Sequence, residues 1–237
     1  MRNYLRVALG GIILTSTAIA TAQANSEWKG NAELGLLLTD GNTETQTTNA
    51  KFNIENERDK WRHSLSLEAL KSGDSDTTTS ERYTGKGKTA YKFSQYNYAF
   101  AEGNAEHDRF NGFDYRASVV LGYGRRLMDE NDMRLDVELG PGYRESKPDA
   151  TEAEGESVFQ VAGKYEWDIS KTTLFSEEIV SQIGEDVTIS KSITSLSAQI
   201  VGNMAMKTSL TIRHTSEVPE EVEKTDSELA VTLVYSF

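Results

Sequence analysis

Three residues near the end of the chain have types and a spacing that suit nucleophilic catalysis. His214 and Ser216 are two residues apart, so on a β-strand they lie on one face, and Glu228 follows them. A serine nucleophile needs an adjacent histidine base that a carboxylate orients. However, His214 alternates in phase with Leu210 and Ile212, whereas Glu228 alternates against the apolar residues of its own segment. The carboxylate is therefore predicted on the opposite face from the histidine.

A second group of charged residues lies on one face of residues 81–93. These four basic side chains alternate with a face that carries Tyr83 and Tyr91; they are Arg82, Lys86, Lys88 and Lys92. Acidic side chains are predicted on the matching faces of other segments: Glu33, Glu55, Glu68, Asp136 and Glu138. Inside a closed sheet, such a basic row favours the passage of anions. The alternative is a network of ion pairs that fills a narrow interior.

Two segments rich in carboxylates, residues 149–156 and 217–226, suggest a third chemistry. Hard divalent cations prefer carboxylate oxygens, so these segments would suit cations near a lipopolysaccharide surface, and Asp74 and Asp76 add a weak motif. The alternative is a solvated, repulsive loop surface. The three histidines at positions 63, 107 and 214 are scattered, and we predict no metal site and no cofactor.

Alternation of apolar and polar residues predicts the elements that position these groups. It can be followed through twelve segments: 27–38, 43–56, 61–71, 81–93, 96–106, 113–127, 133–144, 157–167, 172–183, 188–201, 208–216 and 227–237. The last of them ends on the aromatic Phe237, as the closing strands of bacterial outer-membrane barrels do. We therefore expect an all-β chain that forms a single antiparallel transmembrane β-barrel of about twelve strands.

The connections and the aromatic residues predict an orientation. With both termini in the periplasm, the even-numbered connections are periplasmic, and they are short; the longest, at 72–80, 145–156 and 217–226, are all odd-numbered and extracellular. Six aromatic residues fall at the expected periplasmic rim: Trp28, Trp61, Phe93, Tyr96, Trp167 and Phe237. The opposite rim receives Tyr83, Phe113, Tyr115, Tyr143 and Phe159.

Two places fit the alternation badly. Glu102 shares a face with Tyr98 and Phe100, and the segment 188–201 changes phase near Ser195. A β-bulge would restore the alternation in either place, but its position is not readable from the sequence.

The N-terminus predicts export. Arg2 and Arg6 precede an apolar stretch and small residues, so residues 1–24 are expected to be a cleaved signal peptide and residues 25–237 the barrel domain. Loss of the two arginines changes the net charge from −12 to −14. An acidic chain of this kind is a poor partner for nucleic acid, because phosphate contacts need clustered Lys and Arg.

Several segments together resemble a known family. They are residues 28–35 and 39–45, Asp108-Arg109-Phe110, residues 122–124, residues 140–144 and the closing residues 233–237. The chain is similar over about residues 28–237 to the YdiY-like family of salt-induced outer-membrane proteins, otherwise a domain of unknown function. The resemblance implies the cell outer membrane, a salt or osmotic response, and no catalytic residues. The terminal aromatic, shared with many barrels, implies insertion by the barrel-assembly machinery among outer-membrane lipid and lipopolysaccharide.

The spacing of His214 and Ser216 is also similar to that in outer-membrane lipid A 3-O-deacylases, whose site faces the lipid. Nothing else in the chain resembles that family. We therefore predict a non-enzymatic, porin-like membrane protein with a structural or small-solute or ion-channel role, and keep a lipid A deacylase-like hydrolase as the alternative.

Overall fold

The computed structural model describes residues 28–39, 45–73, 78–108, 113–148, 152–218 and 223–237. The expected signal peptide, residues 1–24, lies outside them. Within the described ranges, no helix is long and apolar enough to cross a membrane.

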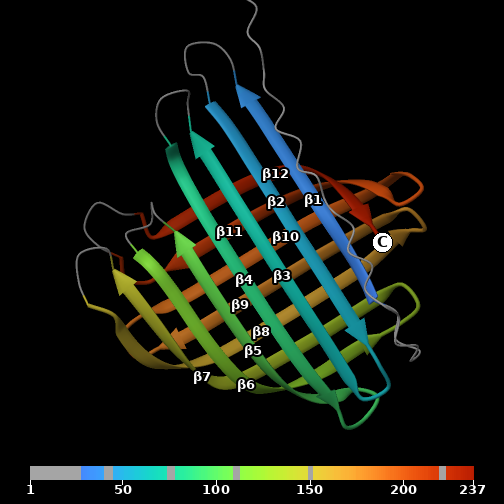
Figure 1. Cartoon of the computed structure of the whole chain (residues 1–237). Helices are drawn as coiled ribbons and strands as arrows, with labels where there is room; N and C mark the ends of the chain where they lie inside the picture. Colours follow the sequence, from blue (N-terminus) through green and yellow to red (C-terminus); the bar gives the residue numbers. More distant parts are fainter. Residues whose placement is uncertain (1–27, 40–44, 74–77, 109–112, 149–151, 219–222) are drawn as a thin grey trace, which may run out of the picture.

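Twelve antiparallel strands form one closed barrel, in which each strand pairs with its neighbours in sequence and β1 pairs with β12 (Figure 1). The predicted fold class is therefore confirmed. The strands are β1 (Trp28–Thr39), β2 (Thr45–Glu57), β3 (Trp61–Gly73), β4 (Thr78–Lys92), β5 (Asn97–Asp108), β6 (Phe113–Asp129), β7 (Met133–Pro148), β8 (Glu154–Ser170), β9 (Thr173–Gly184), β10 (Thr188–Val201), β11 (Met204–Thr215) and β12 (Thr225–Ser236).

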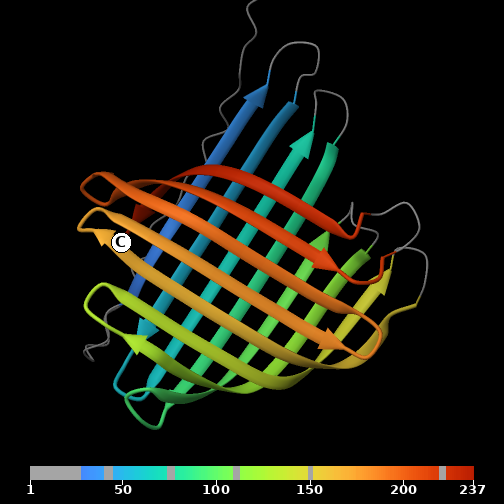
Figure 2. The ribbon, with the colours of Figure 1, turned by 180° about the vertical axis from the view of Figure 1, so that it is seen from behind.

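The two ends of the barrel differ in how their strands are joined. At one end, which we call the short-turn end, the connections are residues 58–60, 93–96, 130–132, 171–172 and 202–203. The first and last described strands also reach this end, since Gly30 and Phe237 exchange backbone hydrogen bonds of 2.9 Å. The other end, which we call the long-connection end, carries the connections between β1 and β2, β3 and β4, β5 and β6, β7 and β8, β9 and β10, and β11 and β12. Figures 1 and 2 show that the strands of the front wall and those of the back wall are tilted in opposite directions, as expected for a sheared barrel.

One short turn depends on a glycine. Gly202 and Asn203 join β10 to β11, and Gly202 has a φ of 53°. A two-residue hairpin loop needs this left-handed conformation, which glycine adopts without steric cost.

Apolar side chains cover the outside of the barrel. On β6 the outward residues Val119 and Leu121 are 60% and 61% exposed, while Val120 between them is 1% exposed. Of the rim aromatics, Trp28, Trp61 and Phe237 near the short-turn end are likewise exposed. Exposed apolar residues over most of this surface would be unfavourable in water, and they match the hydrocarbon of a membrane.

The interior of β5 differs from what alternation suggests. Tyr98, Phe100 and Glu102 all point into the barrel and are 4–6% exposed, so the acidic residue does not face lipid and no bulge is needed there. The register of β5 does shift, but between Glu106 and Asp108. Aromatic residues fit inside because Gly122 and Gly124 face them: a Cβ on Gly124 would lie 2.2 Å from the Tyr98 ring. Gly122 and Gly124 therefore leave room for these two rings.

In strand β10, side chains also alternate between the inside and the outside without interruption through Ser195. The register shift of this strand lies between Gln199 and Val201. Ile189 and Ile193 line the interior, while Ser192 on the outside donates a hydrogen bond of 2.7 Å to Glu177. The apparent change of phase thus reflects apolar residues inside and polar residues outside this wall.

Candidate functional site: the charged lumen

A cavity of about 1360 Å³ occupies the interior of the barrel. Its lining reaches from Lys29, Asn203 and Phe237 at the short-turn end to Glu106 and Arg213 toward the other end. All twelve strands contribute side chains to it, because every second residue of each strand points inward.

The lining is strongly charged but nearly balanced. Twelve of its residues are basic: Lys29, Lys51, Arg62, Lys86, Lys88, Arg116, Arg126, Arg134, Lys164, Lys191, Lys207 and Arg213. Ten are acidic: Glu33, Glu55, Glu57, Glu68, Glu102, Glu106, Asp136, Glu138, Glu166 and Glu178. The acidic excess of the chain, whose net charge is −12, is therefore not located in the lumen.

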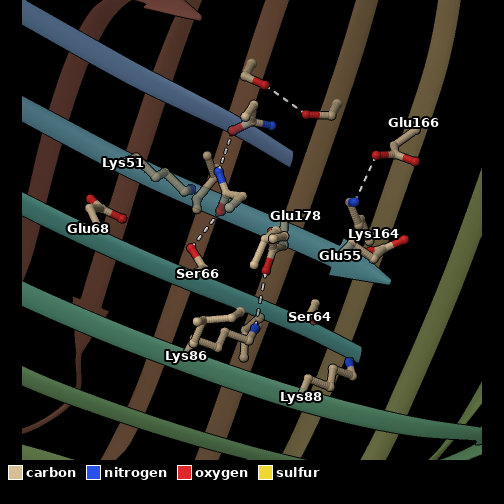
Figure 3. A pocket seen from close by; sticks show the side chains of 18 of the residues that line it. Lys51, Glu55, Ser64, Ser66, Glu68, Lys86, Lys88, Lys164, Glu166 and Glu178 are labelled. Carbon is tan, nitrogen blue, oxygen red and sulfur yellow. Dashed lines mark hydrogen bonds and ion pairs between the residues drawn. The ribbon is translucent and has the colours of Figure 1, made fainter. Parts of the chain in front are cut away.

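The structure places the basic row predicted on residues 81–93 as follows. Lys86 and Lys88 line the cavity, and Lys86 lies 3.3 Å from Glu102 and 3.6 Å from Glu178. Glu178 belongs to β9, so this ion pair connects β4 to a strand that is not its neighbour (Figure 3). Near the short-turn end, Lys92 forms an ion pair of 2.8 Å with Glu57.

Aromatic rings support the ion pairs of Lys88. Its ammonium group lies 4.5 Å from the centre of the Phe100 ring, 3.5 Å from Glu102, and in contact with Glu138. Glu138 also accepts a hydrogen bond of 2.7 Å from the Tyr98 hydroxyl. A buried network whose members all have partners holds a fixed geometry, so this wall of the lumen is rigid.

Near the long-connection end, two arginines pair with carboxylates of non-neighbouring strands, and a third pairs with a carboxylate of the adjacent strand. Arg82 on β4 lies 2.6 Å from Glu228 on β12 and 3.9 Å from Asp108. In addition, Arg213 on β11 pairs with Glu106 on β5, and Arg144 lies 2.6 Å from Glu156. We call Arg82, Arg144 and Arg213 with these partners the arginine belt. Its three arginines are at most 9% exposed, so the belt narrows the lumen at this end.

Sequence reasoning placed Arg82 inward but missed most of this belt. Arg144, Arg213, Glu106 and Glu178 were not selected as site residues, although each lies on the inward face of its strand. Alternation was the available signal. Arg213, for example, lies between the outward residues Ile212 and His214, and alternation therefore predicts that it points inward. Glu156, assigned to a long acidic loop, instead belongs to β8, because β7 and β8 extend to Pro148 and from Glu154.

The structure does not assemble the three residues considered for nucleophilic catalysis. His214 lies on the outside, where its Nδ1 is 2.8 Å from the hydroxyl of Thr225. The Ser216 hydroxyl accepts a hydrogen bond of 2.9 Å from the backbone of Thr188. Glu228 points into the barrel and binds Arg82. The carboxylate and the histidine are thus on opposite sides of the wall, as alternation predicted.

The acidic segments lie partly outside the described residues, including Asp74, Asp76, Asp149, Glu220 and Glu221. Within the part of the chain that the structure describes, no group of three or more His, Asp or Glu side chains is arranged to hold a metal ion.

A closed antiparallel barrel with an apolar outer surface and a charged lumen defines the protein as a transmembrane β-barrel. The profile of the family described as "Protein of unknown function, DUF481" matches residues 32–237, and the chain belongs to this family. It is similar to the uncharacterized protein YdiY of Escherichia coli strain K12, with 27% identity over 216 residues, which is 91% of this chain and 85% of YdiY.

Solved structures share the fold at low sequence identity. The NanC porin is 8% identical with a TM-score of 0.54, and the match covers 89% of this chain and 99% of that one. An outer-membrane channel from Pseudomonas putida F1 is 10% identical with a TM-score of 0.51, over 89% and 95% of the two chains. The KdgM porin in complex with disordered oligogalacturonate is 11% identical with a TM-score of 0.50, over 88% and 99%. These barrels resemble the present one as folds.

Proposed function

We propose that the protein is a non-enzymatic outer-membrane pore for small charged or polar solutes. The observation that carries the proposal is the cavity of about 1360 Å³ lined by ionised side chains of both signs. The likeness to porins and to an outer-membrane channel supports the membrane assignment through the fold.

Unpaired charges indicate that this cavity is filled with water. Lys51, Glu55, Glu68 and Lys191 line it, and none of them has an ion pair or side-chain hydrogen bond with another described residue. An ionised group in a dry interior costs several kcal/mol unless it is paired. Water in the lumen removes this cost. The hydrated lumen reaches the short-turn end, and a pore requires in addition that it is open at the long-connection end.

The arginine belt sets the size limit of this pore. A solute must pass between ion pairs that cross from β4 to β12 and from β11 to β5. The belt also supports the competing function, a structural barrel whose lumen is closed. The two functions differ in whether ions pass the belt.

Further expectations follow from the same assignment. We place the short-turn end in the periplasm, because the described termini reach it and because outer-membrane barrels have short periplasmic turns. This requires that residues 1–24 direct export and that the barrel-assembly machinery inserts the chain among lipid and lipopolysaccharide. A role in salt or osmotic stress is a further prediction, tested by the growth of a deletion strain at high salt.

Conductance distinguishes a pore from a closed barrel. The mature chain, residues 25–237, is refolded, its insertion is verified by a heat-dependent gel shift, and it is added to planar bilayers. Discrete current steps support the pore. Silent bilayers with verified insertion would leave the structural barrel as the function.

A further inference from the structure

Three charged side chains on the wall of the cavity, Lys51, Glu68 and Lys191, are among those that form no ion pair with another described residue. Lys51 of β2 and Glu68 of β3 are cross-strand neighbours, and Lys191 lies on β10. No oppositely charged atom of a described residue lies within 4.0 Å of any of the three, in contrast to Lys86, Lys88 and Lys164. Figure 3 shows Lys51 and Glu68 from adjacent strands with no interaction joining them, while Lys86 and Lys164 are joined to carboxylates.

The three groups nevertheless act on one another through the cavity. Glu68 interacts electrostatically with both Lys51 and Lys191, and the two lysines also interact with each other. On the β10 side, Lys191 is the cross-strand neighbour of Arg213. The separations therefore exceed those of salt bridges but stay within electrostatic range, which leaves space for the polar groups of a small solute.

Neighbouring carboxylates of the two lysines already have partners. Glu106, which interacts with Lys191, pairs with Arg213, and Glu33, the cross-strand neighbour of Lys51, pairs with Lys207 at 3.0 Å. Glu178, which also interacts with both lysines, is held by Lys86 at 3.6 Å. The free lysines and the free carboxylate thus do not collapse onto the existing network.

We propose that Lys51, Glu68 and Lys191 form a binding site for small zwitterionic solutes that carry one carboxylate and one ammonium group. This proposal rests on the proposed function as a pore. The carboxylate of such a solute is attracted by the two lysines, and its ammonium group by Glu68. A simple anion meets the lysines but is repelled by Glu68 and Glu178, whereas a simple cation is repelled by the lysines. A net-neutral solute also leaves the nearly balanced charge of the lumen unchanged.

Liposome swelling with three solutes of similar size tests this site. The refolded mature protein is assayed with β-alanine, with propanoate and with propylammonium at pH 7. Because each water-exposed ion pair contributes little, we expect β-alanine to permeate only about threefold faster than either ion. The triple variant Lys51→Gln, Glu68→Gln and Lys191→Gln is expected to lose this preference.

A matched control changes the same residue types in the short turns, where the side chains are exposed: Lys60→Gln, Glu130→Gln and Lys171→Gln. It is expected to keep the preference for β-alanine. Swelling that is no faster with β-alanine than with propanoate would refute the site while leaving the pore intact. The same holds if the triple variant in the lumen keeps the preference. Absence of swelling with every solute would overturn the pore and the site together.

Discussion

The charge balance of the lumen predicts that two substitutions reverse its ion preference. Changing Lys86 and Lys88 to Glu converts a lining of twelve basic and ten acidic residues into one of ten basic and twelve acidic residues. The unmodified pore is therefore expected to prefer anions weakly, and the double variant to prefer cations.

The size of this effect follows from electrostatics. At about 10 Å in water, one unit charge changes the energy of an ion by about 0.4 kcal/mol. A Debye length of about 10 Å at 0.1 M salt reduces this to roughly 0.15 kcal/mol. The two substitutions change the net charge of the lumen by about four units. This lowers the energy of a cation in the lumen and raises that of an anion, so the energy difference between the two ions shifts by about 1 kcal/mol. This corresponds to about a fivefold change in the ratio of anion to cation permeability.

Reversal potentials across planar bilayers under a KCl gradient measure this ratio. The control Lys60→Glu with Lys171→Glu makes the same change of net charge at exposed positions of the short turns and is expected to have a much smaller effect. Both variants must retain the heat-dependent gel shift. An unchanged ratio in a folded Lys86 and Lys88 double variant would falsify the view that these residues line the conducting path.

Three further predictions concern the lumen wall and the outer surface. Gly124→Val is expected to abolish the gel shift, because a Cβ there would lie 2.2 Å from the Tyr98 ring, whereas Gly103→Val, where nothing lies within 4 Å, is tolerated. Tyr98→Phe is expected to lower the free energy of unfolding in urea by about 1.5–3 kcal/mol through loss of its hydrogen bond to Glu138; an unchanged midpoint would contradict that bond. Ser216→Ala is expected to leave the acyl chains of lipid A unchanged by mass spectrometry; an acyl-chain difference between strains with the intact protein and with the Ser216→Ala variant would instead indicate a hydrolase.

Alternation predicted the strands and most of the inward faces because a barrel wall has a strict period of two residues. It failed at Tyr98 and Phe100 because aromatic residues suit both the lipid surface and a lumen, and only the facing glycines decide between these. Gly122 and Gly124 lie on the neighbouring strand, so the information was present but depended on the register of β5 against β6.

The partners across the lumen were not predictable in the same way. Lys86 with Glu178 and Arg82 with Glu228 join strands that are not neighbours in the sheet. Which inward side chains meet depends on the curvature and shear of the closed barrel, and these are not encoded in any single segment. The arginine belt and the unpaired lysines therefore emerged only from the structure.

Chemical modification of the lumen during conduction tests the central claim most directly. The chain has no cysteine, so Ser66→Cys introduces a single thiol on the cavity wall, and Leu67→Cys places one on the adjacent, outward position. Each variant is inserted into a planar bilayer, and a negatively charged methanethiosulfonate is added. The account predicts that the current through each Ser66→Cys channel changes in a step, while Leu67→Cys channels are unaffected. Bilayers without current, or currents that stay unchanged although mass spectrometry shows that the Ser66→Cys thiol has reacted, would contradict a pore through the charged lumen.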